Sequence, residues 1–152
     1  MSFDVRLETL GPKIIAAVRV QVPIGGVAQA WKPALDRVWT FLRAHPEIEP
    51  GHNLFLYHHP VRRGDPMDVD FGVEVAEPFA DDGTVRCVRT PAGSTATTLL
   101  VGPYARMPAA HDAIHAWCAA NSKQIGSQSW ELYGDWTDDE SRLETAIYYL
   151  LR

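Results

Sequence analysis

Cysteine, excess positive charge and long apolar runs are all scarce in this sequence. Its two cysteines, Cys87 and Cys118, lack metal-type spacing, so we expect reduced, buried thiols and neither a disulfide framework nor a thiolate metal site. No apolar run approaches the length that crosses a bilayer, and residues 1–10 lack the basic start, apolar core and cleavage site of a signal peptide. We therefore expect a cytoplasmic protein that does not enter a membrane.

The charge balance argues against nucleic acid as a direct partner. The formal net charge is -5, and the one short basic cluster, Arg62-Arg63, lies beside Asp65 and Asp68. Phosphate binding depends on clustered lysine and arginine, so we predict neither a nucleic-acid surface nor an anionic-membrane surface. The 152 residues, 46% of them hydrophobic, suffice for a core of their own, and we assign 1–152 to a single domain.

The most informative pattern is an internal repeat. At a constant offset of 76, residues of the same kind coincide without a gap: Ala34 with Ala110, Asp36 with Asp112, Val38 with Ile114, Leu56 with Leu132 and Tyr57 with Tyr133. Such agreement indicates a duplication, here with repeats at about 1–77 and 84–152. Two repeats are too few for a solenoid, so we predict a pseudo-two-fold domain with a ligand cleft at its junction.

Hydrophobic periodicity predicts the same order of elements in both repeats. In the first we expect strands at about 3–9 and 13–22, a helix at 27–44, and strands at 53–58 and 68–76. In the second we expect strands at about 85–90 and 94–101, a helix at 106–121, and strands at 128–134 and 143–151. Each repeat is thus a βαββ unit with one leading strand, which we expect to extend the central pairing.

Each predicted helix carries one apolar stripe, so both should pack by one face on the sheet. The stripes consist of Trp31, Leu35, Val38 and Leu42 in the first helix, and of Met107, Ala110, Ile114, Trp117 and Cys118 in the second. From their place in these stripes we assign Trp31 and Trp117 to the core. The first helix should end at His45, because a residue before proline is pushed out of the helical region.

Several short motifs suggest a family. They are Gly102-Pro103-Tyr104 after an apolar strand, Trp130-Glu131-Leu132-Tyr133, Leu143-Glu144-Thr145-Ala146-Ile147-Tyr148, and in the first repeat 53–60 and 68–73. With these motifs the chain resembles the GyrI-like small-molecule-binding domain, which is also the effector-binding domain of multidrug-responsive bacterial transcription regulators. The resemblance spans about Val5 to Arg152. No helix-turn-helix precedes it, so we expect a stand-alone domain.

The resemblance implies an α+β fold. Two βαββ halves related by pseudo-two-fold symmetry would form one curved antiparallel sheet, with two helices packed on one face and a pocket at the junction. The acidic run Asp138-Asp139-Glu140 and Trp136 replace a loop that often contains proline in the family, so the pocket rim should differ.

Glu131 stands where the first repeat has Phe55, and this mismatch is the best functional clue. If the strand alternates, Ser129, Glu131 and Tyr133 share one face. A carboxylate among aromatic rings is costly to desolvate unless something pairs with it, so an open pocket should leave it hydrated and ready for a cationic ligand. The resemblance assigns that role to Glu131. The alternative is a surface residue paired with a lysine or arginine.

Most of the five Trp, five Tyr and five Phe must fill the core, so few can line a pocket. Besides Glu131, the ligand-binding candidates are Tyr104 in the Gly-Pro-Tyr turn, Tyr133, Phe55 at the symmetry-related place, Tyr149 and Trp39. These residues would provide apolar contact and attraction for a cation above their faces.

Metal and cofactor sites have little support in the sequence. His111 and His115 lie four apart on a helix, but no acidic or thiol ligand completes a site nearby, so we predict no metal and no cofactor. His58 and His59 should be polar strand-end residues that point to opposite faces. The sequence contains neither a phosphate-binding glycine loop nor a serine-nucleophile signature.

Three functions fit these features. The first is a binding module that senses or sequesters a lipophilic, cationic small molecule. The second is a hydrolase of reactive electrophilic molecules, for which Glu131, with a pKa raised by desolvation, would act with Tyr133 or Tyr104. The third is a gyrase-inhibitor-like interaction with a partner protein through acidic loops such as Asp138-Asp139. The first accounts for most of the observations.

Overall fold

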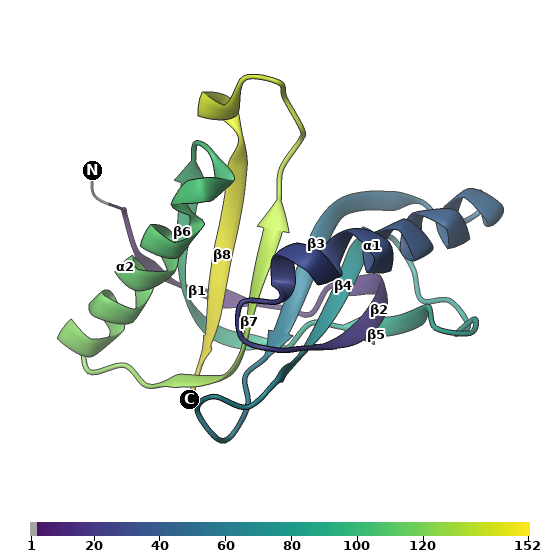
Figure 1. Cartoon of the computed structure of the whole chain (residues 1–152). Coiled ribbons are helices and arrows are strands. Elements are labelled where there is room, and N and C mark those ends of the chain that lie inside the picture. Colours follow the sequence, from purple (N-terminus) through teal and green to yellow (C-terminus); the bar gives the residue numbers. More distant parts are fainter. Residues whose placement is uncertain (1–2) are drawn as a thin grey trace.

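A computed structural model describes residues 3–152, so the first two positions of the predicted first repeat lie outside it. The first half contains β1 (Arg6–Leu10), β2 (Ile14–Val22), α1 (Val27–Ala44), β3 (Pro50–His58) and β4 (Met67–Val75) (Figure 1). The second half contains β5 (Arg86–Arg89), β6 (Gly93–Val101), α2 (Met107–Ala120), β7 (Ile125–Tyr133) and β8 (Glu144–Leu151). These bounds follow the predicted order, and α1 matches its predicted range.

All the strands belong to one curved antiparallel sheet in the order β1-β6-β8-β7-β3-β4-β2-β5, which confirms the predicted fold class. Exchanging each strand for its counterpart in the other repeat reverses this order and leaves it otherwise unchanged. The sheet therefore has the predicted pseudo-two-fold symmetry, with the β3–β7 pair at its centre.

The leading strands lie elsewhere than we predicted. They do not extend the central pairing but form the two edges of the sheet, each attached to the other repeat: β1 pairs with β6, and β5 pairs with β2. The physical reason is that β7 and β4 already occupy both sides of β3, just as β3 and β8 occupy both sides of β7. The exchange ties the two halves together at both edges.

The pseudo-two-fold axis passes through a single residue pair. Phe55 lies directly opposite Glu131 in the β3–β7 ladder. The repeat offset of 76 exchanges these two residues with each other. On one side of them Leu54 pairs with Leu132, and on the other Leu56 pairs with Trp130, as the same offset requires. The two residues that differ most in chemistry thus share the symmetry axis.

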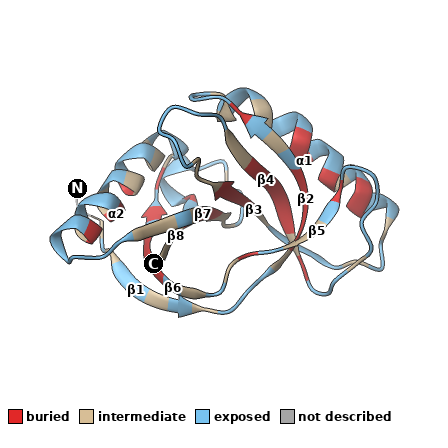
Figure 2. Ribbon diagram, turned by 90° about the horizontal axis from the view of Figure 1, so that it is seen from below, coloured by how far each residue is buried: buried red, intermediate tan, exposed pale blue. Residues whose placement is uncertain are grey.

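Both helices cover the same face of the sheet, one over each half (Figures 1 and 2). The stripe of α1 buries Leu35, Val38 and Leu42 against β2, β3 and β4, and that of α2 buries Ile114 and Cys118 against β6 and β8. At the end of α1, His45 leaves the helical region with φ -126° and ψ 70°, as expected before a proline.

The opposite face of the sheet holds a smaller core of its own, made by Ile15, Ala17, Leu54, Leu56 and Trp130. Trp130 is fully buried there and stacks on Tyr148. Alternation along β7 therefore directs Trp130 and Leu132 to this side and Glu131 to the helix side, as predicted.

Within residues 3–152, no helix is long and apolar enough to cross a membrane. Cys118 is buried on α2 as predicted, whereas Cys87 is only partly buried on β5, which is an edge strand. Both thiols are free.

Candidate ligand pocket

A pocket of about 860 Å³ opens between the N-terminal parts of α1 and α2, above the central β3–β7 pair. Its size lies within the range typical of sites for drug-sized molecules. Both halves contribute, with residues 27–35 of α1 and 107–111 of α2 forming the walls and β3 and β7 the floor. The pocket thus occupies the junction at which the repeat predicted a cleft.

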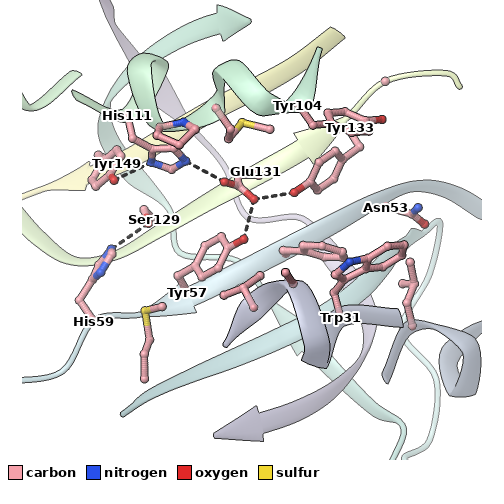
Figure 3. Close-up of a pocket in the computed structure, with 18 of the residues that line it drawn as sticks. Trp31, Asn53, Tyr57, His59, Tyr104, His111, Ser129, Glu131, Tyr133 and Tyr149 are labelled. Carbon is pink, nitrogen blue, oxygen red and sulfur yellow. Dashed lines mark hydrogen bonds and ion pairs between the residues drawn. The ribbon is translucent and has the colours of Figure 1, made fainter. Parts of the chain in front are cut away.

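Glu131 lies at the centre of this pocket and is only 5% exposed (Figure 3). Its Oε1 atom accepts hydrogen bonds from the hydroxyls of Tyr57 and Tyr133, each at 2.6 Å. Its Oε2 atom is 2.7 Å from Nε2 of His111, an ion pair when the imidazole is protonated. Glu131 is therefore neither an exposed strand residue paired with lysine or arginine nor the hydrated carboxylate that we expected.

These partners determine the protonation state of the carboxyl group. Burial acts to raise the pKa of Glu131, but the hydrogen bond and charge interaction with His111, together with the bonds from Tyr133 and Tyr57, outweigh it. The pKa therefore lies below its ordinary value. The raised pKa that we expected from desolvation is wrong, because three donors compensate the buried charge.

The two tyrosines on Oε1 are symmetry mates. Tyr57 on β3 and Tyr133 on β7 are related by the same offset of 76, and each lies two residues beyond the axis pair. Burial and the nearby Glu131 charge raise the pKa of both phenols well above the ordinary value, so both remain protonated donors at neutral pH. The duplication thus supplies two equivalent donors to one carboxylate oxygen.

A second set of polar groups continues from Oε2. His111 Nδ1 lies 2.7 Å from the hydroxyl of Tyr149 on β8, so carboxylate, imidazole and phenol are hydrogen-bonded in series (Figure 3). Behind them, His59 stacks on the Tyr149 ring and its Nε2 lies 2.8 Å from Ser129 Oγ. Burial, followed by the nearby histidines, lowers the pKa of His59.

The opposite wall is apolar and aromatic. Phe55 packs edge-on against Tyr133 with ring centroids 4.9 Å apart, and the Trp31 ring lies 6.4 Å from Phe55. Tyr104 meets Tyr133 edge-on at the rim and is 43% exposed. Trp136, in the loop after β7, also lines the pocket and is 75% exposed, so the rim offers ring faces to an incoming molecule.

A family model for the GyrI-like small-molecule-binding domain matches residues 3–152. The chain belongs to this family. No curated protein matches its sequence, but several solved structures share its fold. The C-terminal domain of EcmrR is 20% identical with a TM-score of 0.82, covering 100% of this chain and 99% of that chain.

Two further structures resemble this GyrI-like domain at lower identity. SAV2435 bound to tetraphenylphosphonium is 13% identical with a TM-score of 0.72, covering 98% of this chain and 94% of that one. A hydrolase from Listeria innocua is 9% identical with a TM-score of 0.67, covering 99% of this chain and 93% of that one. At sequence identities this low, the similarity to these structures shows that the fold is shared and does not show a shared ligand or activity.

Five of the six residues predicted to bind a ligand meet in the pocket of this GyrI-like domain: Glu131, Tyr104, Tyr133, Phe55 and Tyr149. Trp39 does not line it and requires a correction. It lies eight residues beyond Trp31 on α1, about 12 Å further along the axis. There it packs on the first-half core and donates a hydrogen bond to Asn53.

Trp31 was predicted to lie in the core, and this prediction was wrong. The residue lines the pocket and is 39% exposed. Trp117 is partly buried against the second-half core, near its predicted place. The stripe faces the sheet along most of α1, but near its start the helix extends over the cleft, where the indole meets the Phe55 ring of β3 and remains partly exposed.

The sequence reasoning missed Tyr57, His59 and His111, although two of them had a signal. Tyr57 is the counterpart of Tyr133 and shares a strand face with Phe55. His111 is the counterpart of Leu35, a stripe residue, so its imidazole replaces an apolar side chain that faces the sheet. His59 points into the pocket while His58 binds Asp70 on the other face, as their adjacency predicted.

Among residues 3–152, no group of three histidine, cysteine or acidic side chains is arranged to hold a metal ion. His111 and His115 do not act together: His111 binds Glu131, and the His115 ring packs edge-on against Tyr149.

Proposed function

We propose that this GyrI-like domain binds a lipophilic, cationic small molecule, with Glu131 facing the positive charge and the aromatic wall around the apolar part. The observation that carries the proposal is a buried carboxylate of lowered pKa at the centre of a largely apolar pocket. Across the described residues, its only ion-pair partner is His111. A buried charge without a permanent counter-charge favours an oppositely charged ligand.

The aromatic wall supports the same ligand class. Trp31, Phe55 and Tyr133 present rings within one cluster, and a cation over such faces gains about 0.5–2 kcal/mol, depending on its desolvation. SAV2435, which shares the fold, has been determined with tetraphenylphosphonium bound, a lipophilic cation of suitable size to test here.

The test compares tetraphenylphosphonium with neutral triphenylphosphine oxide in calorimetric titrations of the wild type and Glu131→Gln. The amide keeps the shape of the carboxyl group but removes its charge. We expect affinity for the cation to fall by about tenfold or more, equivalent to about 1.4 kcal/mol, and affinity for the neutral compound to change little.

Glu144→Gln is the matched control, because Glu144 is an exposed carboxylate on β8. It should leave both affinities unchanged. A thermal shift gives an independent readout, since ligand at 100 times its dissociation constant adds about 2.7 kcal/mol of stability. The proposal fails if the wild type binds neither compound, or if Glu131→Gln weakens both equally.

A hydrolase of reactive electrophiles is the second candidate, and one observation favours it. Glu131, His111 and Tyr149 are hydrogen-bonded in series, an arrangement suited to moving a proton. Because its pKa lies below the ordinary value, Glu131 is poorly suited to act as the base, and in this candidate function that role passes to the neighbouring imidazole of His111. Mass spectrometry of styrene oxide incubated with the protein tests this: water added across a C–O bond of the epoxide gives the diol. Loss of diol formation in His111→Gln would support the hydrolase.

A further inference from the structure

We infer that His111 determines which ligand charge the pocket accepts: its imidazolium occupies Oε2 of Glu131 as a built-in counter-ion, and a cationic ligand must displace that proton to bind. This inference rests on the proposed function and adds the regulation of the same site. Affinity for a cation should therefore rise with pH, whereas affinity for a neutral molecule should not.

The first step of the argument is the difference between the two carboxylate oxygens. Oε1 already accepts two phenol hydroxyls at 2.6 Å, and both phenols remain protonated because the pKa of each lies well above its ordinary value. Oε2 has one close partner among the described residues, the imidazole of His111 at 2.7 Å. Oε2 is thus the oxygen whose partner is an imidazole, a side chain that exists in a charged and a neutral form.

The second step is that the network stays intact when His111 is neutral. Nε2–H then donates to Glu131, and Nδ1 accepts from the hydroxyl of Tyr149 at 2.7 Å. Burial raises the pKa of Tyr149, so this phenol remains a donor. Losing the proton therefore costs no hydrogen bond but exposes the uncompensated charge of Glu131 to the pocket.

The third step is that the fold does not require an imidazole here. The counterpart of His111 in the first half is Leu35, which is buried and lines the opposite wall. The fold thus accommodates an apolar side chain at the equivalent helix position of the other half. His111 is also within reach of a ligand, because it lines the pocket with its side chain 21% exposed.

The titratable and charged groups around His111 come from three strands and its own helix. They are Glu131 and Tyr133 on β7, Tyr149 on β8, Tyr57 and the adjoining His59 at the end of β3, and Asp112 and His115 on α2. Burial lowers the pKa of His59, and burial raises the pKa of each tyrosine. Glu131 is the only carboxylate that an ion pair joins to His111 within residues 3–152.

The experiment measures the affinity of tetraphenylphosphonium and triphenylphosphine oxide by calorimetry from pH 5.5 to 8. In the wild type, cation affinity should fall as pH decreases, approaching tenfold per pH unit while one proton is displaced. Titrations in buffers of different ionisation enthalpy should show release of up to one proton per cation bound. The affinity of the neutral compound should stay within about twofold over the same range.

Two variants locate the proton. His111→Gln retains an amide N–H to donate to Glu131, and His111→Leu reproduces Leu35, so at least one should fold if the other does not. In both, cation affinity should become independent of pH within about twofold. His115→Gln is the control, because His115 is exposed and does not line the pocket, and it should keep the pH dependence of the wild type.

The outcomes separate this inference from the proposed function. If the wild type binds the cation with the same affinity at every pH, or if His111→Gln retains the slope, the role of His111 is overturned while the proposed function stands. If the wild type binds no cation at any pH, the proposed function fails and this inference with it. A slope that disappears in each His111 variant that folds and persists in His115→Gln supports the inference.

Discussion

The two halves of the domain have the same scaffold but opposite pocket walls. Ala34 and Val38 of the first helix, like their counterparts Ala110 and Ile114, are fully buried against the sheet. At the positions that face the pocket, Leu35 corresponds to His111 and Phe55 to Glu131. The positions that pack on the sheet are thus apolar in both halves. The pocket wall of the first half is apolar, whereas that of the second half can hold charge.

The polarity is reversed on the other face of the sheet. There the first half buries a carboxylate, Asp70, which binds Arg19 at 2.9 Å and His58 at 2.7 Å, and its counterpart in the second half is Ala146. Each half therefore buries one charged group, on opposite sides of the sheet. The repeat provides equivalent places, and single substitutions decide which of them are polar.

The largest effect should come from making the two halves alike at the axis. Phe55→Glu would place a second carboxylate directly opposite Glu131, without donors of its own. An unpaired buried charge beside a like charge should cost about 3–5 kcal/mol of unfolding free energy at neutral pH. Urea unfolding measures this loss, and protonation should restore part of it below about pH 5. Phe55→Leu, which adds no charge, should cost clearly less; equal losses would contradict the electrostatic reason.

The symmetric donors allow a sharper comparison. Tyr57→Phe and Tyr133→Phe each remove one hydroxyl from Oε1 of Glu131, so each should cost about 1.5–3 kcal/mol, the range for hydrogen bonds to charged groups. Because the pKa of Glu131 is lowered in the folded state, its stabilisation is present above the unfolded pKa and lost as pH falls. Removing one donor should raise the folded-state pKa of Glu131, so the stabilisation from its ionised form should be lost at a higher pH. Urea titrations across pH check both points, and losses that differ by more than about 1.5 kcal/mol would show that the two donors are not equivalent.

On the face of the sheet away from the helices, Asp70 in the first half should make the free energy of unfolding sensitive to acid. Burial acts to raise the pKa of Asp70, but His58 and Arg19 outweigh it, so the folded pKa lies below the ordinary value. This stabilisation is full above the unfolded pKa, near 4, and decreases as pH falls through the folded pKa. Asp70→Asn should cost about 1–3 kcal/mol at pH 7 and flatten the dependence on pH below 5. Denaturant unfolding at pH 3–7 is the measurement; an unchanged acid slope would be evidence against this role.

The smallest effect should come from exchanging apolar groups across the axis. Trp31→Met gives the first wall the residue that its counterpart Met107 gives the second. Affinity for tetraphenylphosphonium should fall by about 3- to 10-fold through loss of a ring face, with little change in stability because the indole is partly exposed. Trp39→Phe is the control, because Trp39 lies outside the pocket lining and should leave affinity unchanged. A larger loss in Trp39→Phe than in Trp31→Met would contradict the assigned wall.

Much of the fold could be predicted because its signals are local or periodic. The stripe of Leu35, Val38 and Leu42 predicted α1, and the pair His45-Pro46 predicted its end. The offset of 76 predicted two equivalent halves, and strand alternation placed Glu131 and Tyr133 together on one face. These inferences use only helical periodicity, strand alternation and the repeat offset, which can be read from the sequence without knowing the tertiary arrangement.

Contacts between distant segments decided the rest. The sequence by itself determined that the chain is duplicated, which residues face the helices, and that Glu131 breaks the symmetry. Only the tertiary structure decided that β1 and β5 change halves, that Trp31 rather than Trp39 reaches the pocket, and that His111 and the two tyrosines meet at Glu131. The reason is physical: the charge and proton state of a buried carboxylate depend on the groups brought within hydrogen-bonding distance, and these come from β3, β7 and α2, which no local pattern aligns.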